Sequence, residues 1–99
     1  MNETEETLVE ARRLLTAVGW VQGRMREIDE EGNLIGFCLN GAISEASGNS
    51  LVYDKARSLV RAVINPANIP LFNDFPSTTK KMVLEALDKA IEKAIEKAK

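Results

Sequence analysis

Apolar residues recur at the spacing of a helix in three parts of the chain, which predicts three long helices. The first covers residues 3–18, with Thr4 as its N-cap and Gly19 as a left-handed C-terminal cap. The second covers residues 51–64 and the third covers residues 77–98. The expected apolar stripe of the first helix consists of Leu8, Ala11, Leu14, Leu15 and Val18.

The last predicted helix is the longest, and either Ser77 or Thr78 is expected to cap it. Its apolar side is expected to consist of Leu84, Leu87, Ile91, Ile95 and Ala98. At 1.5 Å per residue it would span roughly 33 Å, whereas a chain of this length has a radius of gyration of only ~13 Å. We expect its end to overhang and to pair with another subunit. The alternative is a helix that lies along the whole domain with a frayed end.

Between the first two helices the pattern changes to an imperfect alternation, which predicts a β-hairpin. Residues 20–28 form its first strand and residues 34–39 its second. Residues 29–32 form the turn, where Gly32 supplies a positive φ angle. The side chains expected to share one face of the first strand are Trp20, Gln22, Arg24, Arg26 and Ile28.

Two shorter segments complete the prediction. Asn40 is expected to cap a short helix over residues 41–46, whose Gly and Ala would let a backbone or a ligand approach closely. Residues 65–76 contain all three Pro, which predicts an irregular loop packed on the core. The predicted order is N-terminal helix, two-stranded β-hairpin, short helix, helix, Pro-rich loop and long C-terminal helix. This is an α+β, mainly helical fold in a single domain over residues 1–99.

Composition excludes several function classes. The 99 residues contain no His and one Cys, which excludes Ser–His and Cys–His nucleophile pairs, His-ligated metals and a thiolate zinc site within one chain. We therefore expect no metal, no cofactor and no enzymatic activity. A formal net charge of −2 argues against general nucleic-acid binding. The chain has no apolar run near 18 residues and begins with acidic residues, so we expect a cytoplasmic protein without a membrane partner.

The first candidate site is basic. Its cations are Arg24, Arg26, Lys55, Arg57 and Arg61. If the hairpin packs beside the helix of residues 51–64, these side chains would form a patch for phosphate or carboxylate groups. Trp20 and Tyr53 would then offer stacking faces for a base. The alternative is that the cations pair with surface Asp and Glu residues.

Two further candidates involve a thiol and carboxylates. Cys38 precedes a predicted helix start, which lowers a thiol pKa, but its apolar neighbours favour a small buried core residue. Asn73 and Asp74, with Asp54 and Asp29 as companions, would bring carboxylates together for acid–base chemistry or a divalent ion. No spacing identifies such a pair, so a structural turn at Asn73-Asp74 is the favoured interpretation.

Four short motifs, in this order, resemble a family of small uncharacterised domains from bacteria and their phages. They are Trp20-x-Gln22-Gly23, Asp29-x-x-Gly32, Cys38-x-x-Gly41-Ala42 and Phe72-Asn73-Asp74, followed by the helix VLEALDKAIEKA. The resemblance covers about residues 8–95, and members usually carry Trp where this chain has Phe72. It implies a fold and a phage or bacterial setting, and it implies no activity. The motif positions it selects are Trp20, Gln22, Gly23, Gly41, Asn73 and Asp74.

The predicted function is a non-enzymatic, cytoplasmic, oligomeric module that binds a small anionic molecule. Its most concrete form is a phage protein that sequesters a nucleotide-derived immune signal in the host cytoplasm. Arg would hold phosphate, the ring would stack on a base, and the amide or carboxylate would contact ribose hydroxyls. The predicted ligand-binding residues are Trp20, Gln22, Arg24, Arg26, Asn73 and Asp74. The alternatives are a module that binds a host or virion protein through its C-terminal helix and a small nucleotide-processing enzyme that uses Asp74.

Overall fold

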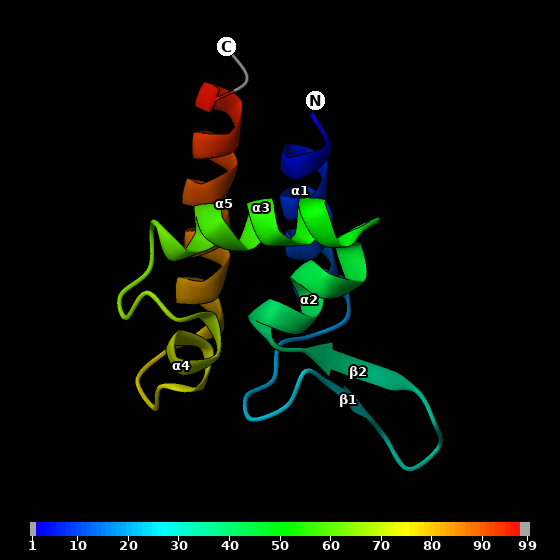
Figure 1. Ribbon diagram of the computed structural model, residues 1–99. Helices are drawn as coiled ribbons and strands as arrows, with labels where there is room; N and C mark the ends of the chain where they lie inside the picture. Colours follow the sequence, from blue (N-terminus) through cyan, green and yellow to red (C-terminus); the bar gives the residue numbers. More distant parts are fainter. Residues whose placement is uncertain (1, 98–99) are drawn as a thin grey trace.

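The computed structural model describes residues 2–97 and contains a helical body with a two-stranded β-hairpin (Figure 1). The predicted α+β, mainly helical fold and its order of elements are confirmed. The elements are α1 (Glu3–Ala17), β1 (Arg26–Ile28), β2 (Leu34–Phe37), α2 (Leu39–Ala46), α3 (Ser50–Arg61), α4 (Ile69–Asp74) and α5 (Lys80–Lys97).

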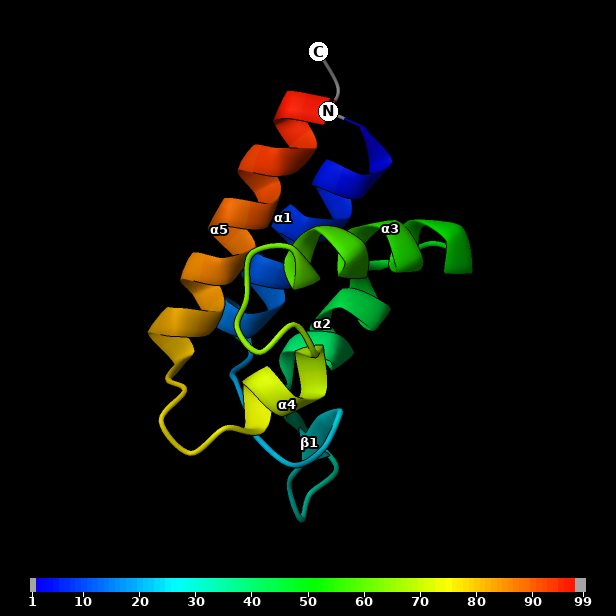
Figure 2. The ribbon, with the colours of Figure 1, turned by 60° about the vertical axis from the view of Figure 1, so that its left-hand side comes forward.

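The long helices α1 and α5 lie side by side and run in opposite directions, and α3 crosses them (Figures 1 and 2). The amide of Asn2 donates to the carbonyl of Ala94 at 3.4 Å, and Arg12 pairs with Asp88 at 2.6 Å. The α5 helix has 18 residues and spans about 27 Å. It lies beside α1, with Ala94 level with the start of that helix and the last turn of α5 continuing beyond it. Pairing of this end with another subunit stays a prediction.

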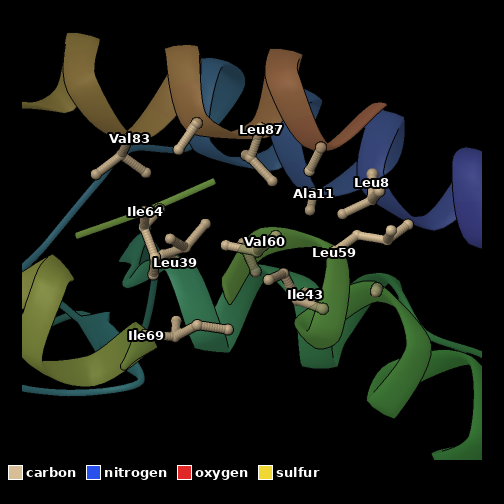
Figure 3. Close-up of a cluster of buried hydrophobic side chains, with 14 of the residues drawn as sticks. Leu8, Ala11, Leu39, Ile43, Leu59, Val60, Ile64, Ile69, Val83 and Leu87 are labelled. Atoms are coloured by element: carbon tan, nitrogen blue, oxygen red, sulfur yellow. The ribbon is translucent and has the colours of Figure 1, made fainter. Parts of the chain in front are cut away.

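One apolar core joins α1, α2, α3, α4 and α5, as Figure 3 shows for the labelled side chains. The predicted stripe of α1 is confirmed, because Leu8, Ala11 and Leu15 are fully buried. The stripe of α5 is rotated from the prediction: Leu84 and Ile91 are only partly buried, Ile95 is 40% exposed, and Ala98 lies outside the described residues. The buried face of α5 consists of Val83, Ala86, Leu87, Ala90 and Ala94. Its small residues let α1 and α3 approach closely, which decides the rotation.

Several predicted helix caps are wrong by one or two residues. Asn2, not Thr4, caps α1 by accepting from the Glu5 N–H at 2.8 Å. Neither Ser77 nor Thr78 caps α5, because the hydroxyl of Thr79 accepts from the Met82 N–H at 3.2 Å. Sequence alone offers several adjacent polar residues at each start, and the direction of the incoming chain selects among them.

The first hairpin strand is much shorter than predicted. Trp20 forms an isolated bridge with Phe37, and regular pairing begins only at Arg26. Gly23 has a φ angle of +83°, which interrupts the extended chain. The expected common face from Trp20 to Ile28 is therefore wrong. The predicted turn is confirmed: Gly32 has a φ angle of +88°, and Asp29 accepts from the backbone N–H of Asn33 at 2.9 Å.

The start of α2 and the Pro-rich segment also differ from the prediction. The second strand ends at Phe37, and Cys38, not Asn40, caps α2, so this helix begins at Leu39. The predicted loop over residues 65–76 contains the six-residue helix α4, which Asn68 caps. No helix in residues 2–97 combines the length and the apolar composition that crossing a membrane requires.

Candidate functional site

Asn73, on α4, joins the segment that follows α1 to the start of α2. Its side-chain oxygen accepts from the indole N–H of Trp20 at 2.6 Å and from the backbone N–H of Leu39 at 2.9 Å. Its amide nitrogen donates to the carbonyl of Val21 at 3.1 Å and to Asp74 Oδ1 at 2.9 Å. An Asn side chain has two acceptor positions and two donors, so all four are used. We call Trp20, Gln22, Gly23, Asn73 and Asp74 the Asn73 clasp.

The remaining members of the clasp tie the segment that follows α1 to the end of α4. Gln22 Nε2 donates to the carbonyls of Asn73 at 2.9 Å and Phe75 at 3.2 Å. The Gly23 N–H donates to Asp74 Oδ1 at 2.8 Å. Four of the predicted ligand-binding residues, Trp20, Gln22, Asn73 and Asp74, are thus brought together, and they bond mainly to one another and to backbone.

The hydrogen bonds of the Asn73 clasp give each of its residues a structural role that requires no ligand. Asn73 is fully buried, and none of the buried side-chain N or O atoms in the described part of the chain lacks a hydrogen-bond partner. Burying polar groups is costly unless they are paired, so this closed network fixes where the hairpin segment crosses α4. Gln22 and Asp74 are exposed, and contact of any clasp residue with a ligand stays a prediction.

The two predicted arginines of the hairpin lie outside the clasp. Both are exposed, and Arg24 lies 3.7 Å from Glu27. Arg57 Nε donates to Asn40 Oδ1 at 2.9 Å, and its guanidinium lies 5.2 Å from the centre of the Tyr53 ring. The Arg61 guanidinium donates to the hydroxyl of Ser58 at 3.1 Å. The predicted cations therefore divide into an exposed pair on the hairpin and a separate group on α3.

Cys38 is a buried capping residue. Its sulfur accepts from the Gly41 N–H at 3.2 Å, and the residue is 7% exposed. Burial raises the pKa of the Cys38 thiol, which disfavours the nucleophilic thiolate. Gly41 lies against the hairpin, because a Cβ there would collide with the carbonyl oxygen of Met25. The Cys38-x-x-Gly41 spacing thus combines a helix cap with close backbone packing.

The candidate carboxylates belong to separate parts of the fold. Asp29 lies in the hairpin turn, Asp54 on α3 and Asp74 at the end of α4. Backbone N–H groups, first that of Asn33, hold the pKa of the Asp29 carboxyl below its usual value. Within residues 2–97, no group of three or more Cys, Asp or Glu side chains is arranged to hold a metal ion.

A large open groove lies between α3, the start of α1 and the end of α5, and the sequence did not predict it. Its volume is about 1010 Å³, at the upper end of the range for small-molecule sites. The α3 helix contributes a stripe that includes Leu51, Lys55 and Leu59, and α5 contributes Lys93 and Lys97. We call this cavity the α3 groove. The one sequence signal was Leu51, an apolar residue in the first turn of the helix that is 63% exposed.

Comparison with known proteins identifies a family and no activity. The model of the Family of unknown function (DUF6197) matches residues 1–93. No curated protein and no solved structure matches the chain. Because the match covers nearly the whole sequence, the chain belongs to the family of unknown function DUF6197.

Proposed function

We propose that the protein is a non-enzymatic module that binds a small anionic molecule in the α3 groove. The observation that carries the proposal is the set of three lysines lining the groove, Lys55, Lys93 and Lys97. None of the three has a carboxylate within ion-pair distance among residues 2–97. Ammonium groups without partners beside a cavity of this size favour a phosphate or carboxylate ligand.

The residues around the groove favour an anionic ligand that also has an apolar or aromatic part. The first residues of α1, Asn2 to Thr4, and the N-cap of α3, Asn49, line the groove, and helix N-termini favour negative charge. Negative charge also lies near the groove, on Glu3, on Asp54 and at the C-terminal end of the α5 dipole. The lysines therefore supply most of the electrostatic attraction for an anion. Leu51, which is 63% exposed, offers apolar surface for the rest of the ligand.

The finer form of the proposal is a phage protein that sequesters a nucleotide-derived immune signal in the host cytoplasm. The resemblance to phage domains supports the setting, and the lysines support a phosphate-bearing ligand. Sequestration needs binding without turnover, which suits a chain that has no His and a buried Cys. The ligand site predicted from the sequence remains the competing site for the same function; its residues are Trp20, Gln22, Arg24, Arg26, Asn73 and Asp74.

Isothermal titration against cyclic dinucleotides and cyclic ADP-ribose isomers tests the function. We expect binding with at least one of them, weakened about tenfold or more by Lys55→Glu. Lys81→Glu on the exposed side of α5 is the matched control, since it changes the net charge equally. If Arg26→Glu abolishes binding and Lys55→Glu does not, the ligand lies on the hairpin. Absence of heat with every compound at protein concentrations near ~100 µM would sink the proposal.

A second candidate function is binding of a host or virion protein, or of another copy, through α5. It is favoured by two exposed apolar residues on the paired helices, Val9 (39%) and Ile95 (40%). Ile95→Glu is the suitable test in a pull-down, because truncation after Leu87 would remove the buried Ala90 and Ala94. A nucleotide-processing activity is the third candidate, and Asp74→Asn would abolish it if Asp74 acts in the chemistry.

A further inference from the structure

The hairpin projects from the helical body (Figure 1). Four of the ten exposed large hydrophobic residues in the described part of the chain lie on it. We call residues 24–37 the hairpin arm. Its base is anchored, since Phe37 is buried and the Cys38 N–H donates to the carbonyl of Met25 at 3.0 Å. Large apolar side chains along the arm are 38 to 50% exposed: Met25, Ile28, Leu34 and Ile35. A two-stranded sheet of this size is marginal in water unless something packs against it.

The outer edge of β1 is open for pairing. The carbonyl of Met25 and the N–H of Asp29 both bond to the chain of β2, at 3.0 Å and 2.8 Å. Backbone groups alternate in direction along a strand, so those of Arg26 and Ile28 point away from β2. The sheet contains only β1 and β2 in the described part of the chain, so no third strand covers this edge. It has no Pro or bulge of its own to block pairing, because the extra residue of the irregular register lies on β2, at Ile35.

The charges of the arm are arranged from base to tip. Arg24 and Arg26 lie at its base, and three carboxylates lie at its tip: Asp29, Glu30 and Glu31. A second arm in antiparallel orientation places its acidic tip beside the basic base of the first. A two-fold axis repeats this contact, so the surface is complementary to itself. This distribution of charge favours a second copy of this chain as the partner that pairs with the β1 edge.

We propose that two copies associate through antiparallel pairing of their β1 edges, which forms a four-stranded sheet in the order β2-β1-β1-β2. Only outward-facing residues form the new hydrogen bonds, so Arg26 of one copy lies opposite Ile28 of the other. This register places Arg24 opposite Glu30 and sets the two Ile28 side chains diagonally on one face, next to Leu34. The two Glu27 residues meet at the centre, each beside its own Arg24.

Sedimentation of the full chain in solution tests this dimer. We expect a dimer whose dissociation constant rises with salt, because the matching charges are exposed. The variants Arg24→Glu/Arg26→Glu and Glu30→Lys/Glu31→Lys each place like charges together, and each should weaken association about tenfold or more. An equimolar mixture of the two variants restores complementary charge and should dimerise.

The controls separate this dimer from other outcomes. Lys81→Glu/Lys89→Glu on α5 changes the net charge as much as the arginine variant does, and it should leave the dimer intact. A wild-type monomer at about 1 mM overturns the proposal, as does a dimer that both arm variants leave unchanged. The dimer is independent of the ligand proposal. Titration of a compound into Glu30→Lys/Glu31→Lys, whose α3 groove is unaltered, shows whether binding survives when the dimer is lost.

Discussion

The indole N–H of Trp20 donates to the side-chain oxygen of Asn73 at 2.6 Å, although 53 positions separate the two residues in the chain. This bond is the centre of the Asn73 clasp, and it joins the Trp20-x-Gln22-Gly23 and Phe72-Asn73-Asp74 motifs of the sequence. The motif residues thus meet in space, and their main observed role is to hold the hairpin segment against α4. Each has a structural reason to be present that does not depend on a ligand.

Replacing Asn73 by Ala should destabilise the fold strongly. The change leaves the indole N–H of Trp20 and the buried N–H of Leu39 without their acceptor. We expect a loss of about 3 kcal/mol in the free energy of unfolding, measured by urea denaturation. Gln22→Ala is the comparison within the clasp, because Gln22 is exposed and should cost no more than about 1 kcal/mol. Equal losses in the two variants would show that burial does not set the strength of the clasp.

Trp20→Phe should report on the indole bond alone. Phe keeps the ring but removes the N–H, so Asn73 retains Leu39 as its donor. We expect a loss of about 1 kcal/mol in the free energy of unfolding, and less in a chain that already carries Asn73→Ala. Additive losses in this double-mutant cycle would contradict a direct interaction. Circular dichroism is the suitable probe, because Trp20 is the only Trp in the chain.

Gly41→Ala should disrupt the contact between α2 and the hairpin. The added Cβ would collide with the carbonyl oxygen of Met25, and a backbone atom cannot move aside as the end of a flexible side chain can. We expect a loss of about 3 kcal/mol or failure to fold. Gly48→Ala is the matched control, since a Cβ there meets nothing within 4 Å. A melting temperature for Gly41→Ala that equals that of the control would refute the close approach.

Cys38 should show a pH-dependent contribution to stability. Burial raises the pKa of its thiol, so the folded protein holds this proton more tightly than the unfolded chain. The contribution is complete below the thiol pKa of the unfolded chain and is lost as pH rises through the raised pKa of the folded state. Cys38→Ser keeps a capping oxygen and should remove this alkaline loss, whereas Cys38→Ala should cost about 1 kcal/mol at neutral pH. Denaturation of the three proteins from pH 7 upward measures both effects.

Asp29 should make the hairpin turn sensitive to acid. Backbone N–H groups of Asn33 and Glu31 lower the pKa of its carboxyl, so the ionised form stabilises the turn. That contribution is present above the carboxyl pKa of the unfolded chain and is lost as pH falls through the lowered pKa of the folded state. NMR titration should show the Asn33 and Glu31 amide signals moving with the Asp29 carboxyl. In Asp29→Ala the two amides should exchange faster with solvent, while Glu30→Ala should leave them protected.

The parts of the fold that sequence predicted are those whose cause is local. The stripe of Leu8, Ala11 and Leu15 follows from helical spacing alone, and the positive φ angle of Gly32 follows from a turn of four adjacent residues. The α+β order of elements rests on the same short-range signals. Composition also excluded some chemistry independently of the fold. A chain that lacks His can form neither a Ser–His nor a Cys–His nucleophile pair.

Tertiary structure decided the features that depend on distant residues. The α4 helix replaces a predicted loop because Ile69 and Phe72 bury in the core and position Asn73 under Trp20. Strand β1 begins late because the Gly23 N–H bonds to Asp74, 51 positions further along the chain. The α3 groove exists only because α3 packs across α1 and α5 and leaves a hollow beside the start of α1 and the end of α5. A periodic pattern records which face of one element is apolar, and packing between elements determines what that face meets.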